Sequence, residues 1–164
     1  MKKRVLFVCM GNICRSPTAE AVLREQVNRR GLADRVEVDS AGTIGYHAGE
    51  LPDSRMRKSA SRRGYTLDSR ARQVTAKDLE TFDYVLAMDK DNLFHLHSLD
   101  RGGRFKDRIG LLTNFLKSRN ADEVPDPYYG GPEGFEHVLD LVEEACEGLL
   151  DVISRELQVG GTKE

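Results

Sequence analysis

Blocks of apolar residues alternate with polar segments along the chain, and their spacing predicts strands and helices in turn. Residues 5–9 form an unbroken apolar run, which predicts a strand buried on both faces, as in a parallel sheet. A polar turn follows, and a helix is expected over residues 16–30. Ser16 suits the N-cap of this helix, Pro17 its first position, and Glu20 lies near the capping-box position. Strand, turn and helix together start a βαβ unit.

The same alternation continues toward the carboxyl end. Strands are expected at residues 36–39, 82–88 and, more weakly, 108–110, and helical segments at 53–63, just after Thr75, and at 89–99, 111–116 and 132–157. The last helix carries apolar side chains at three- and four-residue steps, and a disordered tail is expected over residues 159–164. Residues 1–158 are therefore predicted to form a single α/β domain, a three-layer sandwich with helices on both faces of a parallel sheet.

Composition excludes several classes of protein. A chain of 164 residues can bury a core without disulfides or metal, and its net charge of −2 gives no global bias toward nucleic acid or anionic membranes. The three cysteines, Cys9, Cys14 and Cys146, match neither a secreted disulfide framework nor a zinc site. The apolar run near the N-terminus is too short for a signal peptide, and no segment is long enough to span a bilayer. We therefore expect a reduced, cytoplasmic protein.

The turn after the first strand carries the strongest chemical signal. Cys9 and Arg15 are separated by five residues, between a strand and a helix. The amide N–H groups of such a turn converge at a helix N-terminus, which is an anion-binding arrangement. Gly11 and Asn12 tolerate the positive φ that the turn is expected to require, and Arg15 supplies a planar fork for two phosphate oxygens. The expected phosphate-binding residues of the loop are Met10, Gly11, Asn12, Ile13 and Cys14.

A thiol in this loop is suited to nucleophilic attack. A helix N-terminus and an adjacent cation favour the thiolate, so Cys9 is expected to attack a phosphorus atom in line while the loop stabilises the charge on the phosphoryl oxygens. Ser16 is expected to support the thiolate by a hydrogen bond. The spacing alone is weak evidence, because a buried cysteine usually serves packing. Its strand–turn–helix context favours the functional interpretation, and the sequence contains neither a Walker A loop nor a Rossmann fingerprint.

A second segment supplies a candidate acid. Asp126 lies between Pro125 and Pro127, which stiffen the loop and could hold the carboxyl group over a pocket. The adjacent Tyr128 and Tyr129 are suited to form the wall of a deep slot. Taken alone, the segment fits a simple Pro-Asp turn with two surface tyrosines better.

Both segments together resemble the two signatures of low-molecular-weight protein tyrosine phosphatases. The resemblance rests on residues 8–17 and 126–130, and further matches at 39–42, 71–73 and 82–89 extend it over nearly the whole chain. It implies a four-stranded parallel sheet flanked by helices, with no metal and no cofactor. It also implies hydrolysis of phosphotyrosine proteins or peptides, and of small aryl phosphates, through a phosphocysteine intermediate. Inorganic phosphate would be the product and an inhibitor.

The resemblance also assigns roles to individual residues. Cys9 takes the position of the nucleophile, Arg15 that of the phosphate clamp, and Asp126 that of the general acid and later base. The residues implied to support the loop are Asn12, Ser16 and Ser40, and those implied to wall the substrate-ring pocket are Tyr46, Tyr128 and Tyr129. A reversible disulfide between Cys9 and Cys14, protecting the nucleophile from over-oxidation, is implied in the same way.

Some positions depart from the family pattern or stay open. Some relatives carry a histidine where this chain has Ser69, which puts support of the loop from that side in doubt. Whether Tyr128 or Tyr129 is phosphorylated, and how Tyr46 affects substrate choice, the sequence leaves undecided. Cys146 is expected to be an ordinary core residue. The basic run 55–63 is expected to form a solvated helix face, and attraction of acidic phosphopeptides is the less favoured alternative for it. Surface or capping roles are expected for His47, His95, His97 and His137.

Two alternative functions are compatible with a phosphate-binding loop of this kind. An arsenate reductase of the same fold needs two further cysteines in mid-chain, and positions 15–145 contain none. A non-catalytic phosphate-binding module would lack Cys9 or Asp126, and both are present. The expected partners are phosphotyrosine proteins or peptides, with no nucleic acid and no membrane. A monomer is the default expectation, and a weak dimer through the active-site tyrosines stays open.

Overall fold

The computed structural model describes residues 1–161, with side chains through residue 158. The strands are β1 (Lys3–Cys9), β2 (Val36–Gly42), β3 (Tyr84–Ala87) and β4 (Ile109–Leu111). The helices are α1 (Arg15–Arg29), α2 (Ser54–Arg62), α3 (Ala76–Thr81), α4 (Lys90–Leu99) and α5 (Pro132–Gly161), with 3-10 turns at Arg101–Gly103, Lys106–Arg108 and Leu112–Phe115. The predicted order of strands and helices is confirmed.

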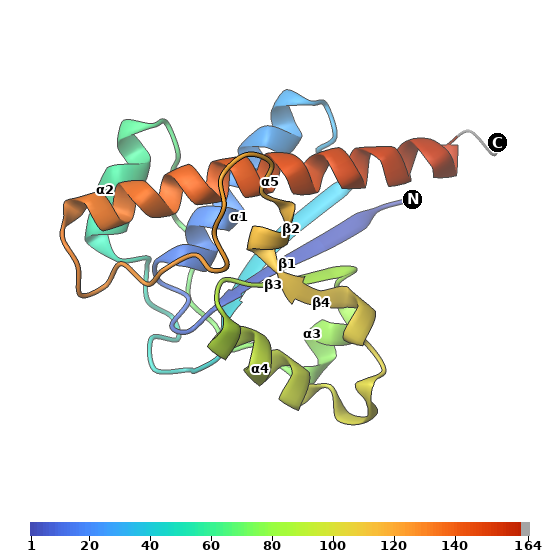
Figure 1. Ribbon diagram of the computed structural model, residues 1–164, viewed down its shortest axis with the longest axis horizontal. Helices are drawn as coiled ribbons and strands as arrows, with labels where there is room; N and C mark the ends of the chain where they lie inside the picture. Colours follow the sequence, from blue (N-terminus) through green and yellow to red (C-terminus); the bar gives the residue numbers. More distant parts are fainter. Residues whose placement is uncertain (162–164) are drawn as a thin grey trace.

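The four strands form one parallel sheet in the order β2-β1-β3-β4. Helices α1, α2 and α5 lie on one face of the sheet, and the shorter α3 and α4 lie on the other (Figure 1). The predicted fold, a three-layer α/β sandwich around a four-stranded parallel sheet, is therefore confirmed.

Alternate side chains of β1 enter two separate cores. Val5 and Phe7 pack in the larger core with α1 and α5, whereas Leu6 and Val8 pack in the smaller core with α3 and α4. All four side chains are fully buried, so burial on both faces produces the unbroken apolar run of this strand. Strand β2 lies on one side of β1, and the next strand along the chain, β3, lies on the other side of β1. The carboxyl end of β1 therefore lies at a switch point, where open α/β sheets form their binding crevice.

Strand β2 is longer than its apolar pattern suggests. Each residue of Val36–Gly42 pairs with one of Lys3–Cys9, so β2 matches β1 along its full length. The predicted strand stopped at Asp39, because Ser40 is polar and Gly42 disfavours strands. In the structure Ser40 is buried and bonded to other polar side chains, and β2 thereby carries it to the edge of the binding crevice.

The first turn of α1 differs from the prediction. The N-cap is Cys14 rather than Ser16, and its side chain makes no capping hydrogen bond. Glu20 does not close a capping box either, because its carboxylate accepts a hydrogen bond from the hydroxyl of Ser40 at 2.6 Å. The helix therefore starts directly behind the Cys9 loop, and its first turn is fixed by tertiary contacts.

Helix α5 is also longer than predicted. It runs to Gly161, past the expected end near Leu157, and residues 162–164 of the expected tail lie outside the described part of the chain. The division into a domain of residues 1–158 and a disordered tail stays a prediction. Within residues 1–161, no helix is both long and apolar enough to cross a membrane.

Glu144 on α5 anchors the loop that leads from the last 3-10 turn toward Asp126. Its Oε2 accepts hydrogen bonds from the backbone N–H groups of Lys117, Ser118 and Arg119 at 2.8, 2.8 and 3.0 Å. The backbone bonds from Arg119 and Ser118 are the main cause that lowers the pKa of Glu144 to about 2. Because the folded-state pKa is depressed, the stabilisation is complete above the unfolded-state pKa of about 4.3 and is lost as pH falls through the folded value.

Replacing this carboxylate should therefore give a pH-dependent loss of stability. We expect Glu144→Gln to lower the free energy of unfolding at neutral pH, and the difference from the parent to shrink as pH falls from about 4 toward 2. Urea unfolding across this pH range measures the effect. Glu147→Gln is a matched control, since Glu147 contacts the ammonium of Lys117 and no backbone N–H among the described residues. A difference for Glu144→Gln that stays constant with pH would contradict the account.

Candidate active site

The loop between β1 and α1 forms the floor of a cavity of about 360 Å³ at the carboxyl end of the sheet. Cys9 and Arg15, at the two ends of this loop, both line the cavity. Asp126 reaches it from the segment before α5, and Tyr46 from the segment after β2. The structure thus brings the predicted acid into one cavity with the predicted nucleophile and clamp, although Asp126 lies far from both in the sequence.

Backbone N–H groups of this loop are available to bind a ligand. In the part of the chain that the structure describes, the N–H groups of residues 11–14 donate no hydrogen bond. The loop carbonyls, by contrast, are used: the oxygen of Met10 accepts from Ile44 N–H at 3.1 Å, and that of Ile13 from Asp53 N–H at 2.8 Å. Buried N–H groups without partners are costly, and at a helix N-terminus they suit an anion. This loop can therefore bind a phosphoryl group.

A chain of buried polar side chains positions the Ser16 hydroxyl beside the Cys9 sulfur. The amide of Asn12 donates to the hydroxyls of both Ser16 and Ser40, at 2.8 and 3.0 Å. Ser40 in turn donates to the carboxylate of Glu20 at 2.6 Å. Because Ser16 accepts from Asn12, its own proton points elsewhere, and two acceptors lie within reach: the Cys9 sulfur at 3.0 Å and the carbonyl of Ala41 at 3.4 Å. The shorter of these two contacts places the Ser16 hydroxyl where it can donate to the sulfur.

Two members of this network were not predicted from the sequence. Glu20 is 4% exposed and is the terminal acceptor of the network, whereas the sequence indicated only a capping role for it. The backbone N–H of Arg72 donates to the side-chain oxygen of Asn12 at 3.0 Å. The loop therefore receives support from this side through a backbone group, and the side chain at Ser69 makes no hydrogen bond among the described residues.

Gly11 and Asn12 serve the turn in different ways. Asn12 has a φ of 60°, as expected. Gly11 does not have a positive φ, so that part of the prediction was wrong. A Cβ at Gly11 would lie 3.0 Å from the ring of His47, tighter than most such contacts. Gly11 is therefore needed for the close approach of His47, which lines the cavity.

The guanidinium of Arg15 is almost fully buried and is held from behind. Its Nη1 donates to Asp89 Oδ2 at 2.6 Å and to the carbonyl of Val124 at 3.0 Å. Burial alone would lower the pKa of Arg15, but Cys9 and the hydrogen-bonded Asp89 raise it above its ordinary value. Arg15 is therefore a fixed cation. Asp89 was predicted only as a helix start, and it does cap α4 as well.

Asp126 is fixed by its own turn. Its Oδ1 accepts the backbone N–H of Tyr128 at 3.0 Å, and its Oδ2 lies 3.8 Å from Nη2 of Arg15. The carboxyl group is partly exposed, so solvent reaches it while it remains close to the clamp. The flanking prolines and this backbone bond together hold it at the cavity edge.

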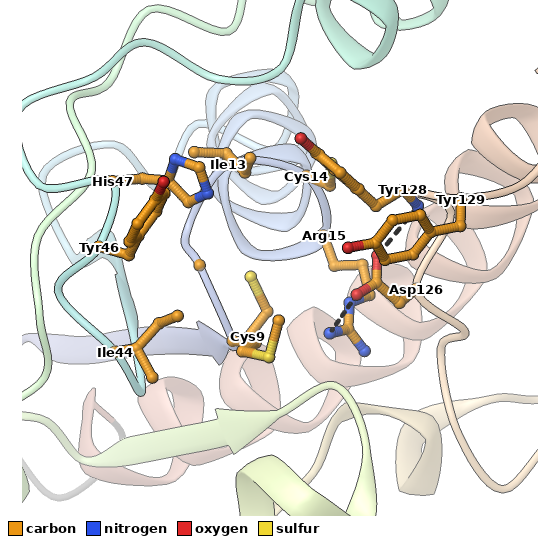
Figure 2. Close-up of a pocket in the computed structure, with 12 residues that line it drawn as sticks. Cys9, Ile13, Cys14, Arg15, Ile44, Tyr46, His47, Asp126, Tyr128 and Tyr129 are labelled. Atoms are coloured by element: carbon orange, nitrogen blue, oxygen red, sulfur yellow. Dashed lines mark hydrogen bonds and ion pairs between the residues drawn. The ribbon is translucent and has the colours of Figure 1, made fainter.

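Aromatic side chains stand on opposite sides of the cavity. Figure 2 shows Tyr46 and His47 on one side, Tyr128 and Tyr129 on the other, and Cys9 between them. Tyr46 and Tyr129 are largely exposed, at 81% and 94%, and Tyr128 is the most sheltered of the three tyrosines. The surface role expected for His47 was wrong, since its ring borders the cavity and stacks edge-on against Tyr46. Ile44, also unpredicted, adds an apolar contact on the same side.

The other two cysteines lie in different surroundings. Cys14 borders the cavity, and burial, followed by the nearby carboxylate of Asp53, raises the pKa of its thiol. Cys146 is fully buried in the larger core, as expected, and burial raises the pKa of its thiol as well. All three cysteines are free thiols.

The chain matches one protein family along nearly its full length. The sequence model for low molecular weight phosphotyrosine protein phosphatases matches residues 4–159. YfkJ, a low molecular weight protein-tyrosine-phosphatase of Bacillus subtilis, is 42% identical over 156 residues, covering 94% of this chain and 98% of its own length. The human low molecular weight phosphotyrosine protein phosphatase is 41% identical over 150 residues, covering 91% of this chain and 94% of its own.

A solved structure agrees with these sequence matches. The crystal structure of a protein tyrosine phosphatase from Entamoeba histolytica, with Hepes in the active site, superimposes with a TM-score of 0.92. That protein is 44% identical, and the match covers 94% of this chain and 99% of the other.

Proposed function

Since this chain belongs to the low molecular weight phosphotyrosine protein phosphatase family and is a phosphatase, we propose that it hydrolyses protein phosphotyrosine through a phosphocysteine at Cys9. One observation carries this proposal above the others. The Cys9 sulfur lies 3.0 Å from the Ser16 hydroxyl, in the same cavity as the buried cation Arg15 and the carboxyl group of Asp126.

In the first step the thiolate of Cys9 attacks the phosphorus atom in line with the scissile bond. The new S–P bond forms as the bond from phosphorus to the aryl oxygen breaks, and that oxygen leaves with the electron pair. The protonated carboxyl group of Asp126 gives its proton to the leaving oxygen. Arg15 and the unpartnered loop N–H groups bind the equatorial oxygens and stabilise the transition state.

In the second step Asp126 acts as a base. Its carboxylate takes a proton from a water molecule whose oxygen attacks the phosphorus, and the S–P bond breaks with its electrons returning to sulfur. The Ser16 hydroxyl, which lies 3.0 Å from the Cys9 sulfur, donates to the departing thiolate. Inorganic phosphate is released, and it is expected to inhibit by occupying the same loop.

The aromatic side chains favour an aryl phosphate as substrate. Tyr46 and Tyr128 stand on opposite sides of the cavity, and offset or edge contacts with aromatic rings stabilise a bound phenyl ring by about 0.5–1.5 kcal/mol each. Turnover of p-nitrophenyl phosphate and of a phosphotyrosine peptide in the presence of EDTA tests the activity. Turnover that EDTA abolishes, or that is confined to alkyl phosphates, would refute the proposed reaction.

A redox role for Cys14 belongs to the same proposal. Both Cys9 and Cys14 border the cavity. A peroxide can oxidise the Cys9 thiolate to a sulfenic acid, its O–O bond breaking as one oxygen passes to sulfur, and attack of the Cys14 sulfur with loss of water then gives a disulfide that a thiol can reduce. Such a cycle fits a reducing cytoplasm, where we place the protein, acting as a monomer. After mild peroxide treatment and then a thiol, the parent should regain activity and Cys14→Ala should not; equal recovery would exclude the protective role.

A further inference from the structure

A second cavity, of about 250 Å³, lies beside the active site between α2 and the start of α5. We call it the α2 groove. Its polar lining comes from Arg55, Lys58, Ser59 and Arg62, and its apolar lining from Pro132 and Phe135. The four polar residues follow helical spacing, so they form one face of α2. Figure 1 shows α2 beside the first turns of α5, next to the segment that carries Tyr128.

The α2 groove is continuous with the wall of the active-site cavity. The guanidinium of Arg55 lies 5.1 Å from the centre of the Tyr128 ring and 4.9 Å from the centre of the Phe135 ring. Tyr128 lines the active-site cavity and Phe135 lines the groove. A peptide whose phosphotyrosine enters the first cavity would therefore pass its neighbouring residues over Tyr128 and Arg55 toward the groove.

The cations of the groove differ in whether they are already paired. Arg55 is bonded to Asp53 at 2.9 Å. Lys58 and Arg62 are exposed, and neither forms an ion pair or a side-chain hydrogen bond within the described residues. The adjacent Arg63 shows the contrast, since it engages three carboxylates of α5: Glu136, Asp140 and Glu143. Those carboxylates are thereby engaged, which leaves the charges of Lys58 and Arg62 for a ligand.

The rest of the groove also suits an anionic side chain. The Ser59 hydroxyl is in a residue only 5% exposed and has no hydrogen-bond partner among the described residues. Pro132 and Phe135 offer an apolar surface on which methylene groups can lie. Two cations, a hydroxyl donor and an apolar floor match a short side chain that ends in a carboxylate or a phosphate.

We propose that the α2 groove binds an anionic side chain that flanks the phosphotyrosine of the substrate peptide, with Lys58 and Arg62 as the residues that select for it. This inference rests on the proposed phosphotyrosine phosphatase function. The site determines specificity and takes no part in bond breaking. A role of the two cations in stabilising α2 alone would affect all substrates equally, whereas the proposed role depends on the charge of the peptide.

The test compares the double variant Lys58→Gln/Arg62→Gln with the parent on four substrates. These are p-nitrophenyl phosphate and three phosphotyrosine peptides of equal length. In the peptides the residues that flank the phosphotyrosine are alanine, glutamate or phosphoserine. We expect kcat/KM to fall about 5-fold on both anionic peptides, mainly through KM and less at high salt, and to be unchanged on the other two substrates. Glutamates placed before or after the phosphotyrosine identify the side that reaches the groove.

A matched control removes the same two charges elsewhere. Arg101 and Arg104 line another cavity, in the segment after α4. The variant Arg101→Gln/Arg104→Gln should leave kcat/KM unchanged on all four substrates. Equal kcat/KM of the parent on the alanine and both anionic peptides, or an equal loss on all substrates in the Lys58→Gln/Arg62→Gln variant, would overturn the groove proposal alone. A loss on the phosphoserine peptide only would restrict the site to phosphate and overturn binding of carboxylates. Failure of the parent to hydrolyse even the alanine-flanked peptide would refute the proposed function, and the groove proposal with it.

Discussion

Cys9→Ser is expected to lower turnover of p-nitrophenyl phosphate by more than about 10⁴-fold, as loss of a covalent nucleophile does in other enzymes. A serine hydroxyl is nearly isosteric with the thiol but is not ionised at neutral pH, so it cannot attack the phosphorus atom. The hydrogen bond with Ser16 at 3.0 Å can be kept by an oxygen. We therefore expect the fold and the binding of inorganic phosphate to persist, measured by thermal unfolding and by calorimetry.

Cys14→Ser is the matched control for this prediction. It makes the same chemical change in the same loop, at a thiol whose pKa burial raises and which therefore stays protonated. We expect it to keep activity within about tenfold of the parent. Undiminished turnover in Cys9→Ser, or a larger loss in Cys14→Ser, would show that the nucleophile is not Cys9.

Asp126→Ala is expected to have an effect that depends on the leaving group. General acid catalysis typically contributes about 10²–10⁴-fold, and it matters most when the departing oxygen is a strong base. The variant should therefore lose far more of its kcat/KM, which reports the first step, on phenyl phosphate or phosphotyrosine than on p-nitrophenyl phosphate. A plot of log kcat/KM against the pKa of the leaving phenol should be steeper for the variant than for the parent.

Asp122→Ala controls for disturbance of the segment before α5. Asp122 is exposed, and its backbone carbonyl, which the substitution keeps, accepts a hydrogen bond from the Thr113 hydroxyl at 2.9 Å. This variant should keep the parent's slope. Equal losses of kcat/KM on good and poor leaving groups in Asp126→Ala would mean that Asp126 positions the substrate or the loop and does not supply the proton.

The fold could be predicted from local patterns because the strands of a parallel sheet are buried on both faces and are therefore continuous apolar runs in the sequence. Strand β1 is apolar throughout since both its faces are covered, and α5 shows its buried stripe clearly. The predicted end of β2 was wrong because Ser40 and Gly42 are strand residues only through their contacts with other elements. The helix start at Ser16 was wrong for the same reason, since no local cap defines it.

The candidate site was partly predictable. Cys9, Arg15 and Asp126 lie in segments whose local composition marks a phosphate loop and a stiff turn. Glu20 and Asp89 act through long-range bonds, to Ser40 and to Arg15, and each also has an ordinary helix-start interpretation. Side chains that serve a site through tertiary contacts have no local signal of their own, so a single sequence does not separate them from caps.

His47 shows a further limit of sequence reasoning. Its ring borders the cavity because Gly11 has no side chain to keep it away. Neither residue shows this fit by itself, since the two are joined only when the segment after β2 folds over the Cys9 loop. Contacts of this kind depend on the shape of the assembled site.

The central claim, a covalent phosphocysteine at Cys9, is tested most directly by trapping the intermediate. Asp126→Ala should form it readily from p-nitrophenyl phosphate, whose leaving group needs no acid, and hydrolyse it slowly for lack of a base. Acid quenching during the steady state, followed by mass spectrometry of the peptides, should therefore find phosphate on Cys9. A burst of p-nitrophenol with Cys9 unmodified, or with phosphate on another residue, would contradict the account.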